Sequence, residues 1–163
     1  MKLRAYLDIE TTGLSRNFSE LTVIGVALET PRTRKVIQFV GSEISDVRLI
    51  ESLQGIDRLY TYNGSRFDLP FIKSKLGIDL NEQFAHTDLM YNCWDCNLKG
   101  GLKIVEQKLA IERKLKEVDG RIAVLLWREY VNNNSRSALN TLLEYNAEDV
   151  LNLITLRKKL AVP

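Results

Sequence analysis

The stretch YLDIETTGLS, residues 6–15, ends a short apolar segment with two carboxylates, Asp8 and Glu10. Acidic residues are depleted in strands, and two of them on one face repel each other at close range. Their spacing of two residues puts both side chains on the same face of a strand. The pair is therefore a candidate for chemistry, with a polar strand end before a Thr-Gly turn as the alternative interpretation.

Two later stretches contain further groups of the same kind. In NGSRFD, residues 63–68, Asp68 stands where a strand is expected to end and a helix to begin. In YNAED, residues 145–149, Tyr145 and Asp149 are four residues apart and share one face of a late helix. Taken alone, Asp68 is also typical of a helix cap, and the Tyr–Asp spacing occurs on many surface helices. The order of the three stretches (strand end, strand–helix junction, late helix) favours a common site.

Four carboxylates at one place destabilise a protein strongly without cations, and their hard oxygen atoms suit Mg²⁺ and Mn²⁺. Two such ions about 3.5–4 Å apart can hold the attacking and leaving oxygens of an in-line phosphoryl displacement. A tyrosine beside them can orient the attacking water, or accept its proton if the pKa of the phenol falls. These residue types therefore predict a two-metal phosphoryl-transfer site.

The elements that must position these residues follow from periodicity and turn signals. Apolar and β-branched runs predict strands at 3–10, 21–30, 35–41 and 57–64, the second and third forming a hairpin around PRTR. Helical spacing with cap and stop residues predicts helices at 42–55, 65–77, 100–111, 120–133 and 135–160. From residue 84 onward the pattern is mostly helical. The order predicts a mixed α/β sheet covered by helices, with chemistry where the carboxyl ends of neighbouring strands meet.

Length and composition indicate one globular domain, residues 1–163, with 45% hydrophobic and 27% charged residues. The formal net charge of +2 is too small to indicate a nucleic-acid binder by overall electrostatics, so any basic surface must be local. No signal peptide opens the chain, and no apolar run approaches the roughly 18 residues of a membrane span. We therefore expect a cytoplasmic protein without a membrane partner.

The three acidic stretches, as DIETTGL, NGSRFDLP and YNAED, resemble the three motifs of the DEDD superfamily of 3′–5′ exonucleases in its tyrosine variant, DEDDy. The YNGSRFDLP stretch is also similar to the proofreading exonuclease domain of family B DNA polymerases. The stretches HTDLMYNCW and GGLKIVEQKLAIERK, and the later Asp-Gly pair, add a resemblance to the YprB-like ribonuclease-H-like domain, a predicted exonuclease family. The resemblance runs from Tyr6 to about Leu156.

This resemblance implies a ribonuclease-H-like fold, a five-stranded mixed sheet with the second strand antiparallel and helices around it. It implies an enzyme that hydrolyses phosphodiester bonds of single-stranded DNA or RNA from a free 3′ end, with two divalent ions, Mg²⁺ or Mn²⁺, as cofactors. Asp8 then bridges both ions, and Glu10 and Asp149 bind the ion that activates water. Asp68 acts on the second ion through water, and Tyr145 orients the nucleophile.

The same resemblance implies substrate contacts around the first two motifs. Four consecutive residues match the loop that packs on the terminal nucleotide, the last as an apolar wedge: Thr11, Thr12, Gly13 and Leu14. Asn63 and Phe67 flank the second motif, where support of the site and contact with a base are expected.

Two alternative functions use the same fold: a non-catalytic module that binds nucleic acid or a protein partner, and a structure-specific endonuclease. The loss of one motif acid favours the first, and all four acids are present with the tyrosine. Release of single nucleotides from a 5′-labelled substrate separates an exonuclease from an endonuclease.

Several other residues have a structural interpretation beside a functional one. Cys93 and Cys96 in CWDC are interpreted as two partly buried thiols on consecutive turns, because no second Cys pair completes a zinc site. His86 is interpreted as structural or surface-exposed, with substrate contact as the alternative. Three aromatic residues are interpreted as core, with stacking on bases as the alternative: Tyr91, Trp94 and Trp127. Five basic residues are interpreted as a solvated helix face, with contact to phosphates as the alternative: Lys99, Lys103, Arg113, Lys114 and Lys116.

Overall fold

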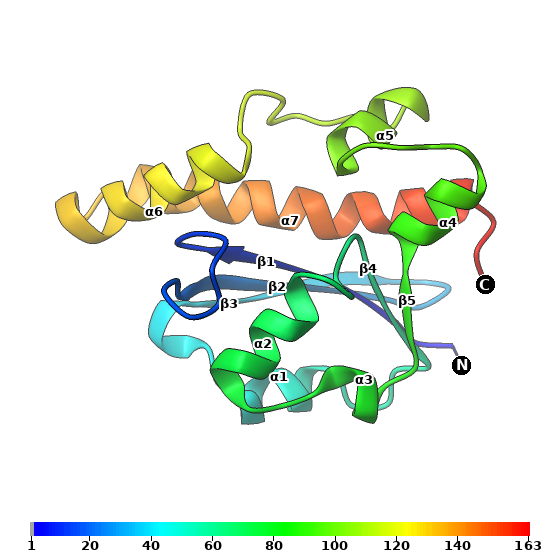
Figure 1. Ribbon diagram of the computed structural model, residues 1–163, viewed down its shortest axis with the longest axis horizontal. Helices are drawn as coiled ribbons and strands as arrows, with labels where there is room; N and C mark the ends of the chain where they lie inside the picture. The colour runs from blue at the N-terminus through cyan, green and yellow to red at the C-terminus, as the bar shows by residue number, and fades with distance from the viewer. Residues whose placement is uncertain (1) are drawn as a thin grey trace.

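A five-stranded mixed sheet forms the middle layer of the computed structural model, which describes residues 2–163 (Figure 1). Its strands lie in the order β3-β2-β1-β4-β5. Their bounds are β1 Arg4–Thr11, β2 Leu21–Glu29, β3 Arg34–Val40, β4 Arg58–Thr61 and β5 His86–Asp88. β2 runs antiparallel to its neighbours β1 and β3, whereas β4 runs parallel to β1 and β5. The prediction of a mixed sheet with an antiparallel second strand is confirmed.

Helices cover both faces of this sheet (Figure 1). On one face lie α1 Asp46–Ser52, α2 Asp68–Leu76 and α3 Leu80–Gln83. On the other lie α4 Leu89–Asp95, α5 Leu102–Lys108, α6 Gly120–Asn133 and the long helix α7 Arg136–Lys159. No helix within residues 2–163 is both long enough and apolar enough to cross a membrane.

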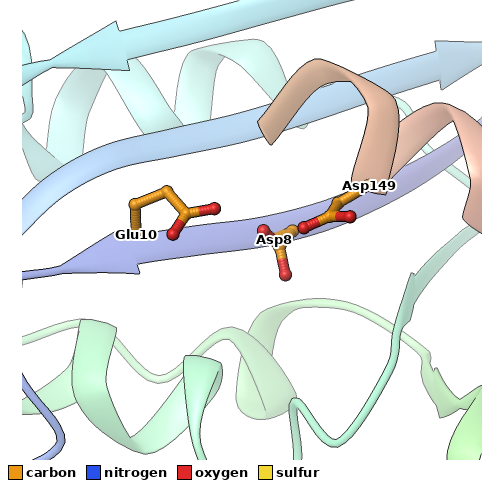
Figure 2. Close-up of side chains that lie close together, drawn as sticks. All are labelled: Asp8, Glu10 and Asp149. Atoms are coloured by element: carbon orange, nitrogen blue, oxygen red, sulfur yellow. The ribbon is translucent and has the colours of Figure 1, made fainter. Parts of the chain in front are cut away.

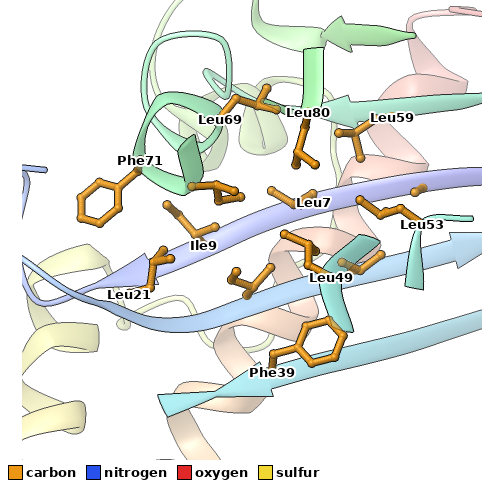
Figure 3. Close-up of a cluster of buried hydrophobic side chains, with 14 residues drawn as sticks. Leu7, Ile9, Leu21, Phe39, Leu49, Leu53, Leu59, Leu69, Phe71 and Leu80 are labelled. Carbon is orange, nitrogen blue, oxygen red and sulfur yellow. The ribbon is translucent and has the colours of Figure 1, made fainter. Parts of the chain in front are cut away.

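Alternation along β1 separates the core from the acidic residues. Ala5, Leu7 and Ile9 are buried in the apolar cluster that packs against α1, α2 and α3 (Figure 3). The intervening side chains leave the opposite face because successive residues of a strand alternate in direction. Tyr6 accordingly packs with the apolar residues of α7. Asp8 and Glu10 share the face of Tyr6, so both point toward α7.

Local signals set the ends of several helices. The Ser135 side chain accepts the N–H of Ala138 and caps α7, and α2 ends at Gly77 with a left-handed φ of 72°. The helix expected at 42–55 begins later, because the side chain of Ser45 caps α1 and residues 41–43 form a 3₁₀ turn.

The mostly helical pattern expected after residue 84 misses strand β5. Three residues, His86–Asp88, are too short to show a periodicity of their own, and they become a strand by pairing with β4. The short helix α3 was not predicted either, and α4 falls in the stretch expected only to be mostly helical. The other strands and helices lie where the sequence predicts them, with ends that differ by a few residues.

Candidate active site

β1 presents its two acids where the sheet opens. β4 pairs with β1 only at Arg4, Ala5 and Tyr6, so the end of β1 has no strand neighbour on that side. The register with β2 shifts between Glu10 and Thr11. Such bulges re-aim side chains at strand ends, often beside active sites.

Helix α7 brings the third acid of the site to these two. One carboxylate oxygen each from Asp8, Glu10 and Asp149 lies within 4.8 Å of the others, and Figure 2 shows the three groups pointing toward one another. Bonds of about 2.1 Å to Mg²⁺ place opposite ligand oxygens about 4.2 Å apart. Small side-chain rotations therefore bring the three oxygens into one coordination sphere, and the donor set fits a divalent ion.

Asp68 lies in the same cavity but outside this close group of three. It is the first residue of α2, and the cap position before it, Phe67, makes no side-chain hydrogen bond. The Asp68 Oδ1 atom instead accepts the backbone N–H of Ile9 at 3.1 Å. Asp68 therefore binds the edge of β1 that β4 leaves open. It does not act as the simple helix cap that its position in the sequence also permits.

Asn146 connects the motif on α7 directly to Asp8. Its side-chain Nδ2 donates to both the backbone oxygen and Oδ2 of Asp8, each at 3.2 Å. Its Oδ1 accepts from Nε2 of Gln38 on β3 at 2.9 Å. The amide fits because β2 carries Gly25 opposite Asp8, and a Cβ at Gly25 would lie 2.1 Å from the Asn146 oxygen. Sequence reasoning missed this set, although an Asn inside an acidic motif is a detectable signal.

Burial and mutual repulsion shift the titration of the acids. Burial, followed by the charges of neighbouring acids, raises the pKa of Asp8 and of Glu10 well above the ordinary carboxyl range. Burial also raises the pKa of Asp68 to about 7 and that of Asp149 to about 6, the latter against the opposing effect of Arg113. A site that holds its carboxylates in this way favours protons at low pH and cations at high pH.

Tyr145 lies one helical turn before Asp149 and is buried in the cavity wall. The Lys103 ammonium lies 5.4 Å from the centre of its ring and the Arg113 guanidinium carbon 5.7 Å. Burial and then the nearby carboxylates raise the pKa of the phenol. In the metal-free protein Tyr145 therefore carries a protonated hydroxyl.

A cavity of about 620 Å³ contains most of the residues selected from the sequence. All five catalytic candidates contribute to its wall, together with Thr11, Gly13, Leu14, Asn63 and Phe67. Thr12 does not, because its hydroxyl accepts the Glu20 N–H and closes the loop between β1 and β2. The opposite wall comes from the start of α6, with Asp119, Gly120, Arg121 and Val124, which sequence reasoning did not select.

The turn that carries Asn63 into the cavity depends on Asp88, at the end of β5. The Asp88 carboxylate accepts the N–H of Asn63 at 2.7 Å and that of Ser65 at 3.0 Å. Asn63 adopts a left-handed φ of 60°, and a Cβ at Gly64 would meet the Thr61 side chain at 2.2 Å. The Asn-Gly pair is therefore a structural requirement of this turn, and Asp88 has a supporting role that was not predicted.

The residues with alternative interpretations divide between structure and site. His86 bonds the Thr61 hydroxyl at 2.9 Å, and burial lowers its pKa. The expectation that both thiols are partly buried is wrong for Cys96, which is exposed because it ends α4, whereas Cys93 is buried. Tyr91 and Trp94 contact each other edge to face, and Trp127 packs against Tyr130. These aromatic residues do not line the cavity.

Some of the basic residues chosen from the sequence lie at the site, and others lie away from it. Lys103 and Arg113 line a smaller cavity of about 390 Å³ together with Asp8, Tyr145 and Asp149. Lys114 and Lys116 lie farther along the same surface, in a cavity that Lys103 also borders. Two of the five basic residues therefore lie at the candidate active site.

Several known proteins are similar to this chain over most of its length. YprB of Bacillus subtilis (strain 168) is 27% identical over 93% of this chain, which spans 40% of the length of YprB. A family B DNA polymerase from Pyrobaculum calidifontis matches with a TM-score of 0.75 and 18% identity over 99% of this chain and 25% of the polymerase. Brucella melitensis NrnC, in a structure with pGG, matches with a TM-score of 0.65 and 23% identity over 96% of this chain and 71% of NrnC.

The family model described as the RNase_H superfamily matches residues 5–161. That range contains every strand but the first residue of β1, and all the acidic residues of the cavity. The two solved structures share this ribonuclease-H-like nuclease fold at low sequence identity. The chain therefore belongs to the RNase_H superfamily.

Proposed function

We propose that this protein is a metal-dependent 3′–5′ exonuclease of the tyrosine-variant DEDD type, which hydrolyses phosphodiester bonds in single-stranded nucleic acid with two divalent ions. One observation carries the proposal: oxygens of Asp8, Glu10 and Asp149 lie within 4.8 Å of one another. Tyr145 lines the same cavity. A buried carboxylate cluster without cations opposes folding, so stability of the fold does not explain why acids stand at these places.

The acids supply the negative charge that holds cations at the end of β1. Divalent ions bound there contribute the positive charge that offsets the charge developing on the phosphate during in-line displacement. Asp8, Glu10 and Asp149 supply the ligand oxygens, and Asn146 keeps the Asp8 carboxylate turned toward α7. Asp68 lines the same cavity outside the close group of three, where it would hold the second ion.

Tyr145 orients the attacking water. In the metal-free protein its hydroxyl is protonated, because burial and the carboxylates raise its pKa, and a phenol hydroxyl can donate one hydrogen bond and accept another. A water held between Tyr145 and the acids is aligned for attack on a phosphate placed in the cavity. Positioned groups of this kind contribute about 10²–10⁴ in rate.

The terminal nucleotide occupies the cavity of about 620 Å³, a volume in the usual range for small-molecule sites. Leu14 is 86% exposed although it is apolar, and Phe67 lies in the same wall. Both are available to pack on a base. The structure of NrnC with pGG and a further NrnC structure with bound Mg²⁺ support an oligonucleotide and a divalent ion as the ligands of this fold.

The proposal is tested with DNA and RNA oligonucleotides of one sequence, each labelled at the 5′ end and incubated with Mg²⁺, Mn²⁺ or EDTA. We expect a ladder that shortens by single nucleotides from the 3′ end, with no products in EDTA. Oligonucleotides labelled at the 3′ end should release a labelled mononucleotide as the first product. The ratio of DNA to RNA rates then identifies the preferred sugar.

Asp8→Asn is the control, because it removes one ligand charge and keeps the side-chain volume. Discrete larger fragments with wild-type protein would instead indicate an endonuclease. Retention of the oligonucleotide without any metal-dependent product would indicate a binding module. Hydrolysis by Asp8→Asn at the wild-type rate would mean that the activity comes from another site or another protein.

A further inference from the structure

Arg113 reaches the acidic site from the segment between α5 and α6. Its guanidinium donates from Nε and Nη2 to the two oxygens of Glu106, both at 2.7 Å. Nη2 also donates to Oδ1 of Asp149 at 2.5 Å. Arg113 is 7% exposed and Glu106 only 1% exposed, so the whole arrangement is buried.

Contacts on both sides hold this arginine in place independently of Asp149. Asn152 on α7 donates from Nδ2 to Oε1 of Glu106 at 3.1 Å and to the backbone oxygen of Glu112 at 3.2 Å. Glu148 accepts the backbone N–H of Leu115 at 3.1 Å and that of Lys114. The segment that carries Arg113 is thus attached to α7 at positions next to Asp149 and one turn beyond it.

We propose that Arg113 is a positioning residue that fixes Asp149 in the orientation in which it binds the metal ion. Ligating carboxylates are commonly held by a hydrogen-bond donor behind them, and loss of such a donor typically weakens metal binding by about 10–100-fold. Arg113 contacts only one oxygen of Asp149, and a carboxylate has lone pairs for further partners. The inference rests on the proposed metal-dependent function.

The geometry distinguishes this role from competition with the metal. The oxygens of Asp8, Glu10 and Asp149 are already within 4.8 Å of one another while the Arg113 contact is present. Glu106 accepts two hydrogen bonds from the guanidinium and balances its charge, so the pair presents a donor with little net charge. Repulsion of an incoming cation is correspondingly small.

Stability alone does not account for a buried ion pair at this place. The Nη1 atom of Arg113 is buried without a hydrogen-bond partner, and it lies 3.9 Å from a carboxylate oxygen of Glu148, too far for a hydrogen bond. Apolar residues of similar volume often replace buried ion pairs without loss of stability. An incompletely satisfied arginine beside the acidic cavity is better explained by what it does to Asp149.

The test measures Mn²⁺ binding by titration calorimetry on protein stripped of metal, together with the melting temperature in EDTA. The main variant is the double substitution Glu106→Leu with Arg113→Met, which removes both buried charges and leaves neither unpaired. We expect its Mn²⁺ affinity to fall by about 10–100-fold while the protein remains folded. Arg113→Lys keeps the charge but cannot span two carboxylates, and we expect a loss in the same direction.

Arg157, on α7 eight residues after Asp149, provides a matched control. It is equally buried, at 7% exposure, and pairs with Glu29 and the Tyr6 hydroxyl. Arg157→Met should lower the melting temperature and leave Mn²⁺ affinity unchanged. A change in the melting temperature alone is the result expected when a purely structural arginine is replaced.

The outcomes separate this inference from the proposed function. Absence of Mn²⁺ binding by the wild-type protein would reject the proposed function itself. Wild-type binding with unchanged affinity in both Arg113 variants would reject the positioning role alone. Tighter binding in the variants would show that Arg113 competes with the metal and would overturn the inference in the opposite direction. If the double variant does not fold, Arg113→Lys decides between the same outcomes.

Discussion

We expect a single methyl group added to β2 to weaken metal binding at the site, because it displaces the side chain that orients Asp8. In Gly25→Ala the new Cβ would lie 2.1 Å from Oδ1 and 2.8 Å from Cγ of Asn146. Asn146 is fully buried and held by Gln38, so it cannot swing into solvent. The amide must shift or rotate, and its Nδ2 then leaves Asp8, where it makes two hydrogen bonds of 3.2 Å.

The size of the effect follows from these contacts. Overpacking a well-filled interior costs about 1–3 kcal/mol. For a domain of this size that corresponds to a fall in melting temperature of roughly 2–12 °C. Because Asp8 also loses the donor that orients it, we expect Mn²⁺ affinity to fall by about 10–100-fold.

The assay combines thermal unfolding in EDTA with Mn²⁺ titration and hydrolysis of a labelled oligonucleotide. A double variant, Gly25→Ala with Asn146→Ala, separates crowding from orientation. Removal of the Asn146 amide relieves the clash, so the melting temperature should recover from that of Gly25→Ala. Metal affinity should stay low because Asp8 still lacks its donor. Gly25→Ala with the melting temperature and Mn²⁺ affinity of the parent would refute this reasoning.

Three further predictions concern the acids and the tyrosine. Asp8→Asn and Asp149→Asn should each abolish hydrolysis with the fold retained by circular dichroism, and activity within a few-fold of wild type would contradict the ligand role. Tyr145→Phe should slow single-turnover hydrolysis by about 10²–10⁴ with Mn²⁺ affinity nearly unchanged, and a loss below about tenfold would make Tyr145 structural. Burial raises the pKa of Asp68 to about 7 and that of Asp149 to about 6, above their ordinary value of 3.8. The folded state therefore binds more protons than the unfolded state between these values, so the melting temperature in EDTA should decrease as pH rises from about 4 to about 7. Mn²⁺ affinity should increase over the same range, since the ion competes with those protons, and a calorimetric affinity independent of pH would contradict this linkage.

Much of the framework was predictable because its signals are local. The alternation along β1 places Asp8 and Glu10 on one face, and this depends only on the strand repeat. The Ser135 cap and the apolar spacing after it specify α7, and with it the shared face of Tyr145 and Asp149. The left-handed Gly77 ends α2 as expected. Strand β5 was missed, since three residues carry no period of their own.

The parts of the site that the sequence alone did not reveal are the supporting contacts. Asn146 lies over Gly25, which is distant in sequence, and nothing local to either residue indicates that the two touch. Arg113 looks like one basic residue among several on a helix face, yet it is buried between Glu106 and Asp149. A side chain's type and spacing are properties of its own segment and can be read there. Its partners are decided by how α7 and the segment before α6 pack on the sheet, because hydrogen bonds and burial depend on distances that only the folded chain establishes.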